Sequence, residues 1–311
     1  MIKLNIANLN NVLDNHYEKI ISLVRLEAIT KINERQYVKD NLERIIKAEK
    51  EDFNTIADEV SSFNKKELSL AFVGSKKKDK TKKGSSNGYE KFAKKSSKIY
   101  NAYDLAKKLN IHVCPYCNRN YIHTIKSIYD KSARPQFDHF ICKKEHPIFA
   151  LSFFNLIPCC SVCNSSIKGQ SKFSFETHIH PYFDDFNKIK KFTTSKPPLM
   201  IYNIEEFEIE FKNGVAKDSD RADNFIKDFA LEALYNCHKD KVLELVDFSR
   251  AYNENSLENL VKEFAKSTKI FKNTNDIKRL LLCHHIEDIN IDKRPLNKLI
   301  KDISEELGLI P

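Results

Sequence analysis

The sequence predicts an α+β protein that is mostly helical, with a central cysteine-bearing module between N- and C-terminal helical regions. Two observations carry this prediction. Apolar residues recur at three- and four-residue steps in both flanking regions, as on the buried face of a helix. The centre holds two Cys-x-x-Cys pairs, with short apolar runs between them. The 311 residues are enough for two or three compact units.

Residues 1–73 are expected to be helical, because VLDNHYEKIISLVRLEAI and the segment from about Glu34 through Ala48 have the helical period. A Lys-rich region follows at 74–98. Residues 64–98 contain twelve lysines against three acidic residues and so hold the chain's whole net charge of +9. The stretch from Gly74 to Gly88 has no apolar residue to bury, which predicts a flexible, solvated loop.

Two interpretations of this loop stay open. It is either an arm that attracts phosphate groups or a solubilising linker. In the first interpretation the chain would contact nucleic acid through Lys76, Lys77, Lys78, Lys82 and Lys83.

The central module is expected to span residues 99–190, with a short helix leading into the first cysteine pair. Cys114 and Cys117, with Cys160 and Cys163, supply the four soft ligands of a closed structural zinc site. Cys159 could replace Cys160, but the x-x spacing to Cys163 favours Cys160. A redox interpretation of CPYC competes, yet it would leave the second pair unexplained.

Between and beside the pairs lie residues suited to a second metal. Asp138-His139 in RPQFDHF is predicted to lie at a strand end. Neighbouring strand residues face opposite sides, so the two would not simply form one pair of ligands. A bend after Phe137 could let the carboxylate bind metal while the imidazole faces a substrate water. Asn155 in LSFFNLIP and Asn164, which should open a helix after Cys163, strengthen the signal.

The remaining chain is predicted to be a connector and a helical region. Alternation in PLMIYNIEEFEIEFKNG and its closing Asn213-Gly214 indicate a β-hairpin, which makes 191–217 a hairpin connector. Residues 218–311 return to the helical pattern. No apolar run reaches the roughly 18 residues of a membrane span, and the start lacks the apolar block of a signal peptide. We therefore expect a cytoplasmic protein with no membrane partner.

Residues 110–185 resemble the HNH endonucleases, which have the ββα-metal (His-Me finger) fold, in the variant whose zinc staple consists of four cysteines. The family pattern is Cys-x-x-Cys, Asp-His, an Asn before Leu-x-Pro, and Cys-x-x-Cys followed by His or Asn and a Lys. The matching residues here are Cys114, Cys117, Asp138, His139, Asn155, Cys160, Cys163, Asn164 and Lys168. The module also looks like the HNH subunit of Septu-type antiphage defence systems, which works with an ATPase.

The resemblance implies a role for each matching residue. His139 would be the general base, and Asp138 and Asn164 would hold one Mg²⁺ or Mn²⁺. Asn155 would orient the catalytic loop, and Lys168 would contact phosphate. Two features depart from the common form of the family: the third catalytic position is Asn164 instead of the His of the family name, and Lys168 lies five residues after Cys163, one more than usual.

The expected function is a metal-dependent endonuclease that hydrolyses phosphodiester bonds of DNA, in antiphage defence, with zinc purely structural. An ATPase or another defence subunit would be its protein partner. The alternative is a non-catalytic zinc module that binds nucleic acid or a partner protein. The Asp138, His139, Asn155 and Asn164 set separates the two, because a binding module needs the thiolates but not these four residues.

Overall fold

The computed structural model describes residues 1–74, 87–96, 98–126, 131–252, 259, 262–264, 266 and 274–310. The proposed nucleic-acid contacts at Lys76, Lys77, Lys78, Lys82 and Lys83 lie outside these residues. The chain divides into two compact units. Unit 1 comprises Met1–Leu4, His112–Tyr121 and Asp184–Pro311, and unit 2 comprises Asn5–Ile111 and Ile122–Phe183. Helices predominate and each sheet in the described part has two strands, so the predicted α+β class is confirmed.

Unit 2 begins with a series of short helices. In α1, burial of Val12, His16 and Ile20 at four-residue steps gives the helix its inner face. A capping box between Asn101 and Asp104 starts α7 by satisfying its first backbone N–H groups. The helices are α1 (Leu9–Ile20), η1 (Ile21–Leu23), η2 (Leu26–Ala28), α2 (Ile32–Asp40), α3 (Leu42–Lys47), α4 (Lys50–Glu59), α5 (Lys65–Leu68), η3 (Ser69–Val73), α6 (Gly88–Phe92) and α7 (Ala102–Leu109).

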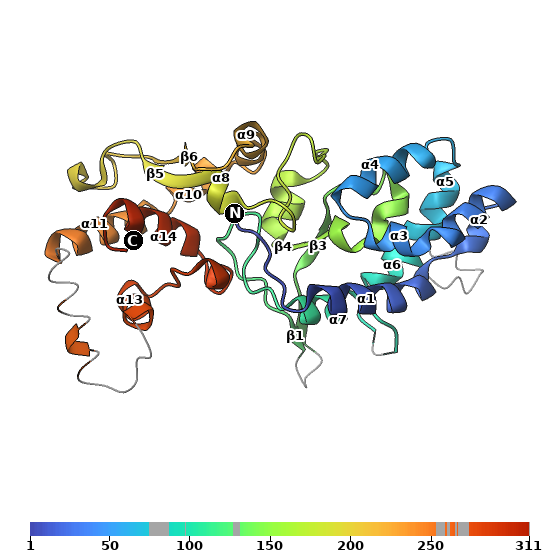
Figure 1. The fold of residues 1–311 in the computed structure, drawn as a ribbon, viewed down its shortest axis with the longest axis horizontal. Helices are drawn as coiled ribbons and strands as arrows, with labels where there is room; N and C mark the ends of the chain where they lie inside the picture. The colour runs from blue at the N-terminus through green and yellow to red at the C-terminus, as the bar shows by residue number, and fades with distance from the viewer. Residues whose placement is uncertain are drawn as a thin grey trace. The chain divides into compact units, whose positions relative to one another are not determined.

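The strands of unit 2 position the candidate site. Strand β3 (Gln136–His139) pairs antiparallel with β4 (Leu156–Cys159), as Figure 1 shows, and the register sets Asp138 opposite Ile157. All four residues of β4 are buried, which explains its apolar sequence LIPC. The π-helical turn η6 (Val162–Lys168) follows β4. The other elements are β1 (Ile125–Lys126), β2 (Ser132–Ala133), η4 (Pro147–Leu151) and η5 (Phe153–Asn155).

Unit 1 contains the third strand pair. Strand β5 (Lys190–Thr194) pairs antiparallel with β6 (Ile209–Asn213), whereas residues 198–200, in the segment expected to hold the first strand of the hairpin, form the 3₁₀ helix η7 (Pro198–Met200). Gly214 follows β6 as expected of a turn residue, and a Cβ there would lie 2.3 Å from the carbonyl oxygen of Lys188. The remaining elements are α8 (Phe186–Ile189), α9 (Ser219–Asp228), α10 (Leu231–Asn236), α11 (Lys239–Ala251), α13 (Thr274–Leu282), η8 (Asp288–Asn290) and α14 (Asn297–Glu306).

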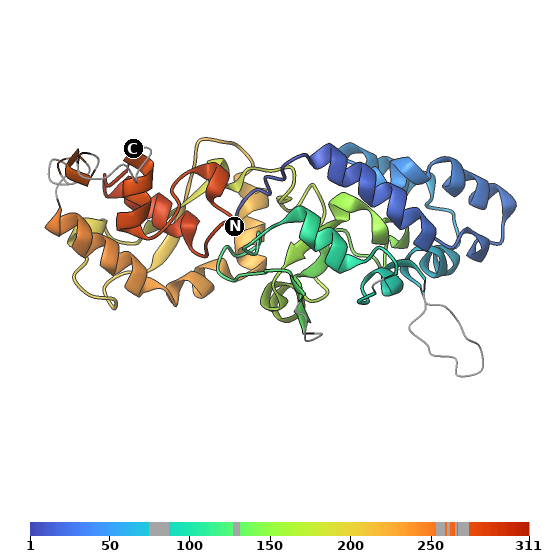
Figure 2. The same ribbon diagram turned by 90° about the horizontal axis from the view of Figure 1, so that it is seen from below.

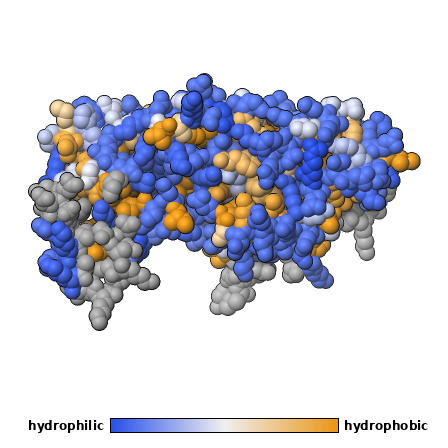
Figure 3. Space-filling model, in the orientation of Figure 1, coloured by the Kyte–Doolittle hydropathy of each residue, from blue (hydrophilic) through white to orange (hydrophobic). Residues whose placement is uncertain are grey.

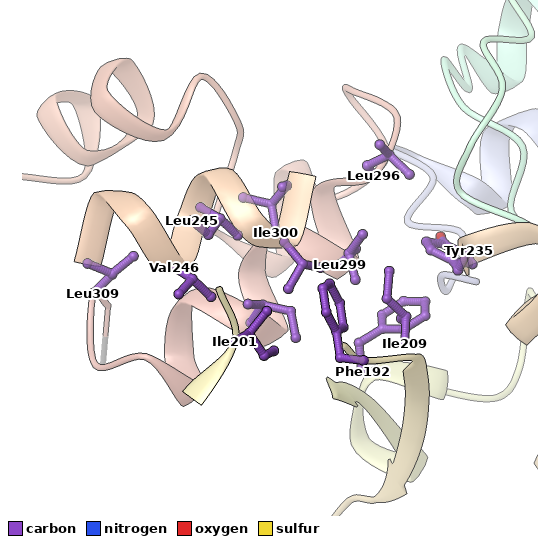
Figure 4. Packing of buried hydrophobic residues seen from close by; sticks show 13 residues of the cluster. Phe192, Ile201, Ile209, Tyr235, Leu245, Val246, Leu296, Leu299, Ile300 and Leu309 are labelled. Carbon is purple, nitrogen blue, oxygen red and sulfur yellow. The ribbon is translucent and has the colours of Figure 1, made fainter. Parts of the chain in front are cut away.

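The core of unit 1 lies between this strand pair and the C-terminal helices. Phe192 and Ile209 from the strands meet Val246 of α11 and Leu299 of α14 in one buried cluster (Figure 4). The two helices pack against each other, as the view in Figure 2 also shows. Burial of such side chains is the main stabilising contribution to a unit of this size.

Hydrophilic residues cover most of the molecular face drawn in Figure 3. Within the described ranges, no helix combines the length and the apolar composition that crossing a membrane requires.

Candidate metal centre and active site

Four buried cysteines form a cluster that could hold a metal ion such as zinc. The Sγ atoms of Cys114, Cys117, Cys160 and Cys163 all lie within 4.8 Å of one another. A tetrahedral zinc with Zn–S bonds of about 2.3 Å requires S···S separations of about 3.8 Å, which this cluster accommodates. The donor set is therefore compatible with zinc in number, softness and spacing.

Backbone amides support the thiolate form of these cysteines. The N–H of Cys163 donates to Sγ of Cys160 at 3.4 Å, and the N–H of Arg119 donates to Sγ of Cys117 at the same distance. Such hydrogen bonds favour the charged sulfur and orient it as a ligand. The left-handed backbone of Asn118, at φ 50°, reverses the chain after the first pair.

Cys159 lies outside the cluster. It is the last residue of β4, and the cluster contains its neighbour Cys160 instead. Burial raises the pKa of the Cys159 thiol well above its ordinary value, and the nearby charge of Asp138 adds to this effect. All eight cysteines are described, and none forms a disulfide.

A pocket of about 210 Å³ in unit 2 brings together four of the residues singled out in the sequence. Asp138 and His139 from β3, and Asn164 and Lys168 from η6, all line it. Strand β3 continues through Phe137 to His139 in regular register with β4, without the bend considered after Phe137, and both Asp138 and His139 are among the residues that line the pocket. Asn155 does not line the pocket.

A hydrogen bond from one ring nitrogen holds the imidazole of His139 in place. Its Nε2 lies 3.0 Å from the carbonyl oxygen of Ala150. A carbonyl can only accept, so Nε2 carries the hydrogen, and in the neutral ring Nδ1 is then the basic nitrogen. Burial lowers the pKa of His139 well below its ordinary value, and the positive charges of Lys143 and Lys168 lower it further. The ring is therefore neutral at pH 7 and can accept a proton at Nδ1.

The Asp138 carboxylate makes a buried ion pair. Lys168 Nζ donates to Asp138 Oδ2 at 2.7 Å and also to the carbonyl oxygen of His139 at 2.8 Å. Both side chains are almost fully buried, at 3% and 7% exposed. Lys168 thus contacts the proposed metal ligand directly, in addition to lining the pocket where we expected it to meet phosphate.

The Asn164 side chain is oriented by β3. Its Nδ2 donates to Gln136 Oε1 at 2.8 Å, and Ser165 Oγ donates to the same oxygen at 2.9 Å. Because the amide nitrogen is used by Gln136, the amide oxygen is the end of the side chain left for a cation.

Asn155 holds the loop that follows β3 in place through hydrogen bonds. It is fully buried, its Oδ1 accepts from the N–H of Ile141 at 2.7 Å, and its Nδ2 donates to the carbonyl oxygens of Ile141 and Phe149. These bonds fix the chain directly after His139. Asn155 has the geometry of a residue that orients a loop.

Sequence reasoning missed three residues that shape the pocket. The Tyr89 ring packs edge-on against His139 with centroids 4.4 Å apart, and Lys143 Nζ lies 4.1 Å from the centroid of the Tyr89 ring. Gln136 orients Asn164. Lys143 could have been found from the two lysines that closely follow FDHF, but nothing in the sequence near Tyr89 connects it to His139.

No family model, curated protein or solved structure matches this chain. The assignment of function therefore depends on the residues and on the geometry of the cluster and the pocket.

Proposed function

We propose that this chain is a metal-dependent endonuclease that hydrolyses phosphodiester bonds of DNA. The observation that carries the proposal is the single pocket lined by Asp138, His139 and Asn164, built on two antiparallel strands and the helical turn that follows them. A zinc ion in the cysteine cluster would be structural. Cys163 directly precedes Asn164, so this metal would hold the start of η6 in place.

His139 is the proposed general base. Its Nδ1 has the lone pair, the ring is held by Ala150 and Tyr89, and burial keeps it neutral. A fixed neutral imidazole is suited to take a proton from the water that attacks the phosphorus.

Two residues that line the pocket offer oxygen donors for a hard divalent cation. Asp138 offers a carboxylate oxygen and Asn164 an amide oxygen, which are the donors that Mg²⁺ and Mn²⁺ prefer. When bound, the ion would neutralise the scissile phosphate and the leaving 3′ oxygen. Asn155 would keep the loop after His139 in position while the substrate binds.

Lysines provide the charge to attract a nucleic-acid backbone. Lys143 and Lys144 line the pocket, and so does Tyr89, which lies within the Lys-rich region 74–98. The lysines of that segment are the second proposed source of phosphate contacts. Contacts of this kind add affinity without sequence specificity.

The direct test is replacement of the base. Purified protein, with its zinc content measured, is incubated with plasmid DNA, single-stranded DNA and RNA in the presence of Mg²⁺ or Mn²⁺. We expect His139→Ala to reduce cleavage at least ~100-fold. His146→Ala is a matched control, because His146 lies in the loop that follows β3 but outside this pocket. Equal cleavage by wild type and His139→Ala would rule out the catalytic assignment.

The biological setting we propose is antiphage defence, with an ATPase or another defence subunit as partner. It is supported by the resemblance to the HNH subunit of Septu-type systems. A non-catalytic zinc module is the second possibility, and it predicts DNA or protein binding without cleavage under every metal condition tested. Co-expression with the neighbouring genes of the source genome, followed by affinity purification, tests for the partner.

A further inference from the structure

The lining of the candidate active site has an excess of positive charge. Among the described residues, its lining contains one acidic residue, Asp138, and three lysines, Lys143, Lys144 and Lys168. Asn164 has no charge, and His139 adds no negative charge in either protonation state. Like charges are poorly screened in a partly buried site. A divalent cation that enters this pocket without nucleic acid would therefore meet net repulsion.

Lys168 has the strongest effect on this balance. Its ammonium group bonds Asp138 Oδ2 and the His139 carbonyl oxygen and lies 4.6 Å from the centroid of the Phe173 ring. It is 4% exposed, so it is held in place and desolvated. The one carboxylate that lines the pocket is therefore already neutralised by a fixed positive charge.

We infer that metal binding in this pocket depends on the bound nucleic acid, and that Lys168 sets this dependence. A backbone phosphate would bring the negative charge that the pocket lacks, so cation and nucleic acid bind cooperatively. The free protein then holds the cation weakly, and the catalytic site is complete only on its substrate. This inference rests on the proposed function, because it takes the pocket to be the site for substrate and cation.

Thermodynamic linkage makes the coupling measurable from either side. If nucleic acid tightens cation binding, the cation must tighten nucleic-acid binding by the same factor. If Lys168 only contacted phosphate, the result would differ. Its removal would then weaken DNA binding and leave cation binding by the free protein unchanged.

The experiment uses the full zinc-loaded chain with His139→Ala, so that DNA stays intact. Mn²⁺ binding to the free protein is measured by electron paramagnetic resonance, and the Kd of a fluorescein-labelled duplex is measured by anisotropy with and without Mn²⁺. We expect weak Mn²⁺ binding by the free protein and at least a tenfold decrease in the DNA Kd when Mn²⁺ is added. Asp138→Asn should abolish the Mn²⁺ effect, which corrects for ions bound by the DNA itself.

Lys168→Met, in the same background, should bind Mn²⁺ at least tenfold more tightly without DNA and show a smaller effect of Mn²⁺ on DNA binding. Lys172→Met is the matched control, because Lys172 is an exposed lysine outside this pocket, paired with Glu145. Its binding should equal that of the parent. The melting temperature of each variant checks folding, and the coupling in the parent protein tests the inference even if Lys168→Met does not fold.

Equal DNA Kd values with and without Mn²⁺ in the parent would overturn the inference, as would unchanged or weaker Mn²⁺ binding by a folded Lys168→Met. Failure of the proposed function has a different signature. In that case cleavage by the otherwise wild-type chain would be absent or insensitive to His139→Ala, whatever the binding measurements show.

Discussion

Asn155 connects the stability of unit 2 to the geometry of the pocket. The effect of replacing it on both can be predicted in detail. Asn155→Ala removes three hydrogen bonds, to the N–H and carbonyl oxygen of Ile141 and to the carbonyl oxygen of Phe149. Each bond contributes about 1 kcal/mol, which sums to about 3 kcal/mol, and buried partners left unsatisfied raise the loss to as much as about 5 kcal/mol. We therefore expect the free energy of unfolding to decrease by about 3–5 kcal/mol.

The same change should affect activity beyond its effect on stability. Ile141 is two residues after His139, so release of this loop from Asn155 would let the proposed base move from its position. A displacement of about 1 Å at a reacting group can lower the rate about 100-fold. We expect the folded fraction of Asn155→Ala to cleave DNA with a kcat reduced by that order.

The assay is urea denaturation followed by circular dichroism, combined with cleavage measured well below the unfolding midpoint. Asn54→Ala is the control, since Asn54 is an exposed asparagine of unit 2 whose side chain bonds Glu176. It should change stability by less than about 0.5 kcal/mol. A loss below about 1 kcal/mol for Asn155→Ala, or an unchanged kcat, would refute this account of Asn155.

Three further predictions concern zinc, pH and the Lys-rich segment. Metal analysis should find one zinc per chain, and Cys117→Ser or a strong chelator should lower the melting temperature markedly; a zinc-free, equally stable protein would contradict the structural site. Burial lowers the pKa of His16 from 6.5 to about 4. Between these values the unfolded chain binds a proton that the folded chain does not, so stability should fall by about 3 kcal/mol as pH decreases from 6.5 to 4. Urea titrations at several pH values should show that His16→Gln lacks this decrease, and an identical pH profile in the variant would argue against it. Deleting residues 75–87 should weaken DNA binding and flatten its salt dependence in anisotropy titrations, whereas a solubilising linker would change neither.

The cysteine cluster could be predicted from the sequence because its information is local. Two ligands three residues apart reach one ion from a single turn of chain, and thiolates select soft metals. The choice of Cys160 over Cys159 follows from the same spacing, and the cluster contains Cys160. The α+β class was predictable for a similar reason, since helical periodicity is a property of short windows.

Contacts between distant segments could not be predicted in this way. Lys168 and Asp138 are 30 residues apart, and only tertiary packing brings the ammonium group to the carboxylate. The sequence pattern also did not predict strand β5, because its residues do not alternate between apolar and polar. Its sequence KKFTT buries Lys190, Phe192 and Thr194 on one face, so polar residues occupy inward positions where the alternation rule expects apolar ones.

The turn η6 connects the cysteine cluster to the proposed catalytic pocket over a short stretch of sequence. Cys163 belongs to the cluster, the next residue is Asn164, and Lys168 ends the same turn. Asn164 is bonded to Gln136 of β3, and Lys168 to Asp138 of the same strand. A metal at the cluster would therefore fix one end of a short helical segment whose pocket-lining side chains are bonded to β3. Because a catalytic group displaced by about 1 Å can lose most of its effect, such a short connection gives the two sites a physical reason to share one turn.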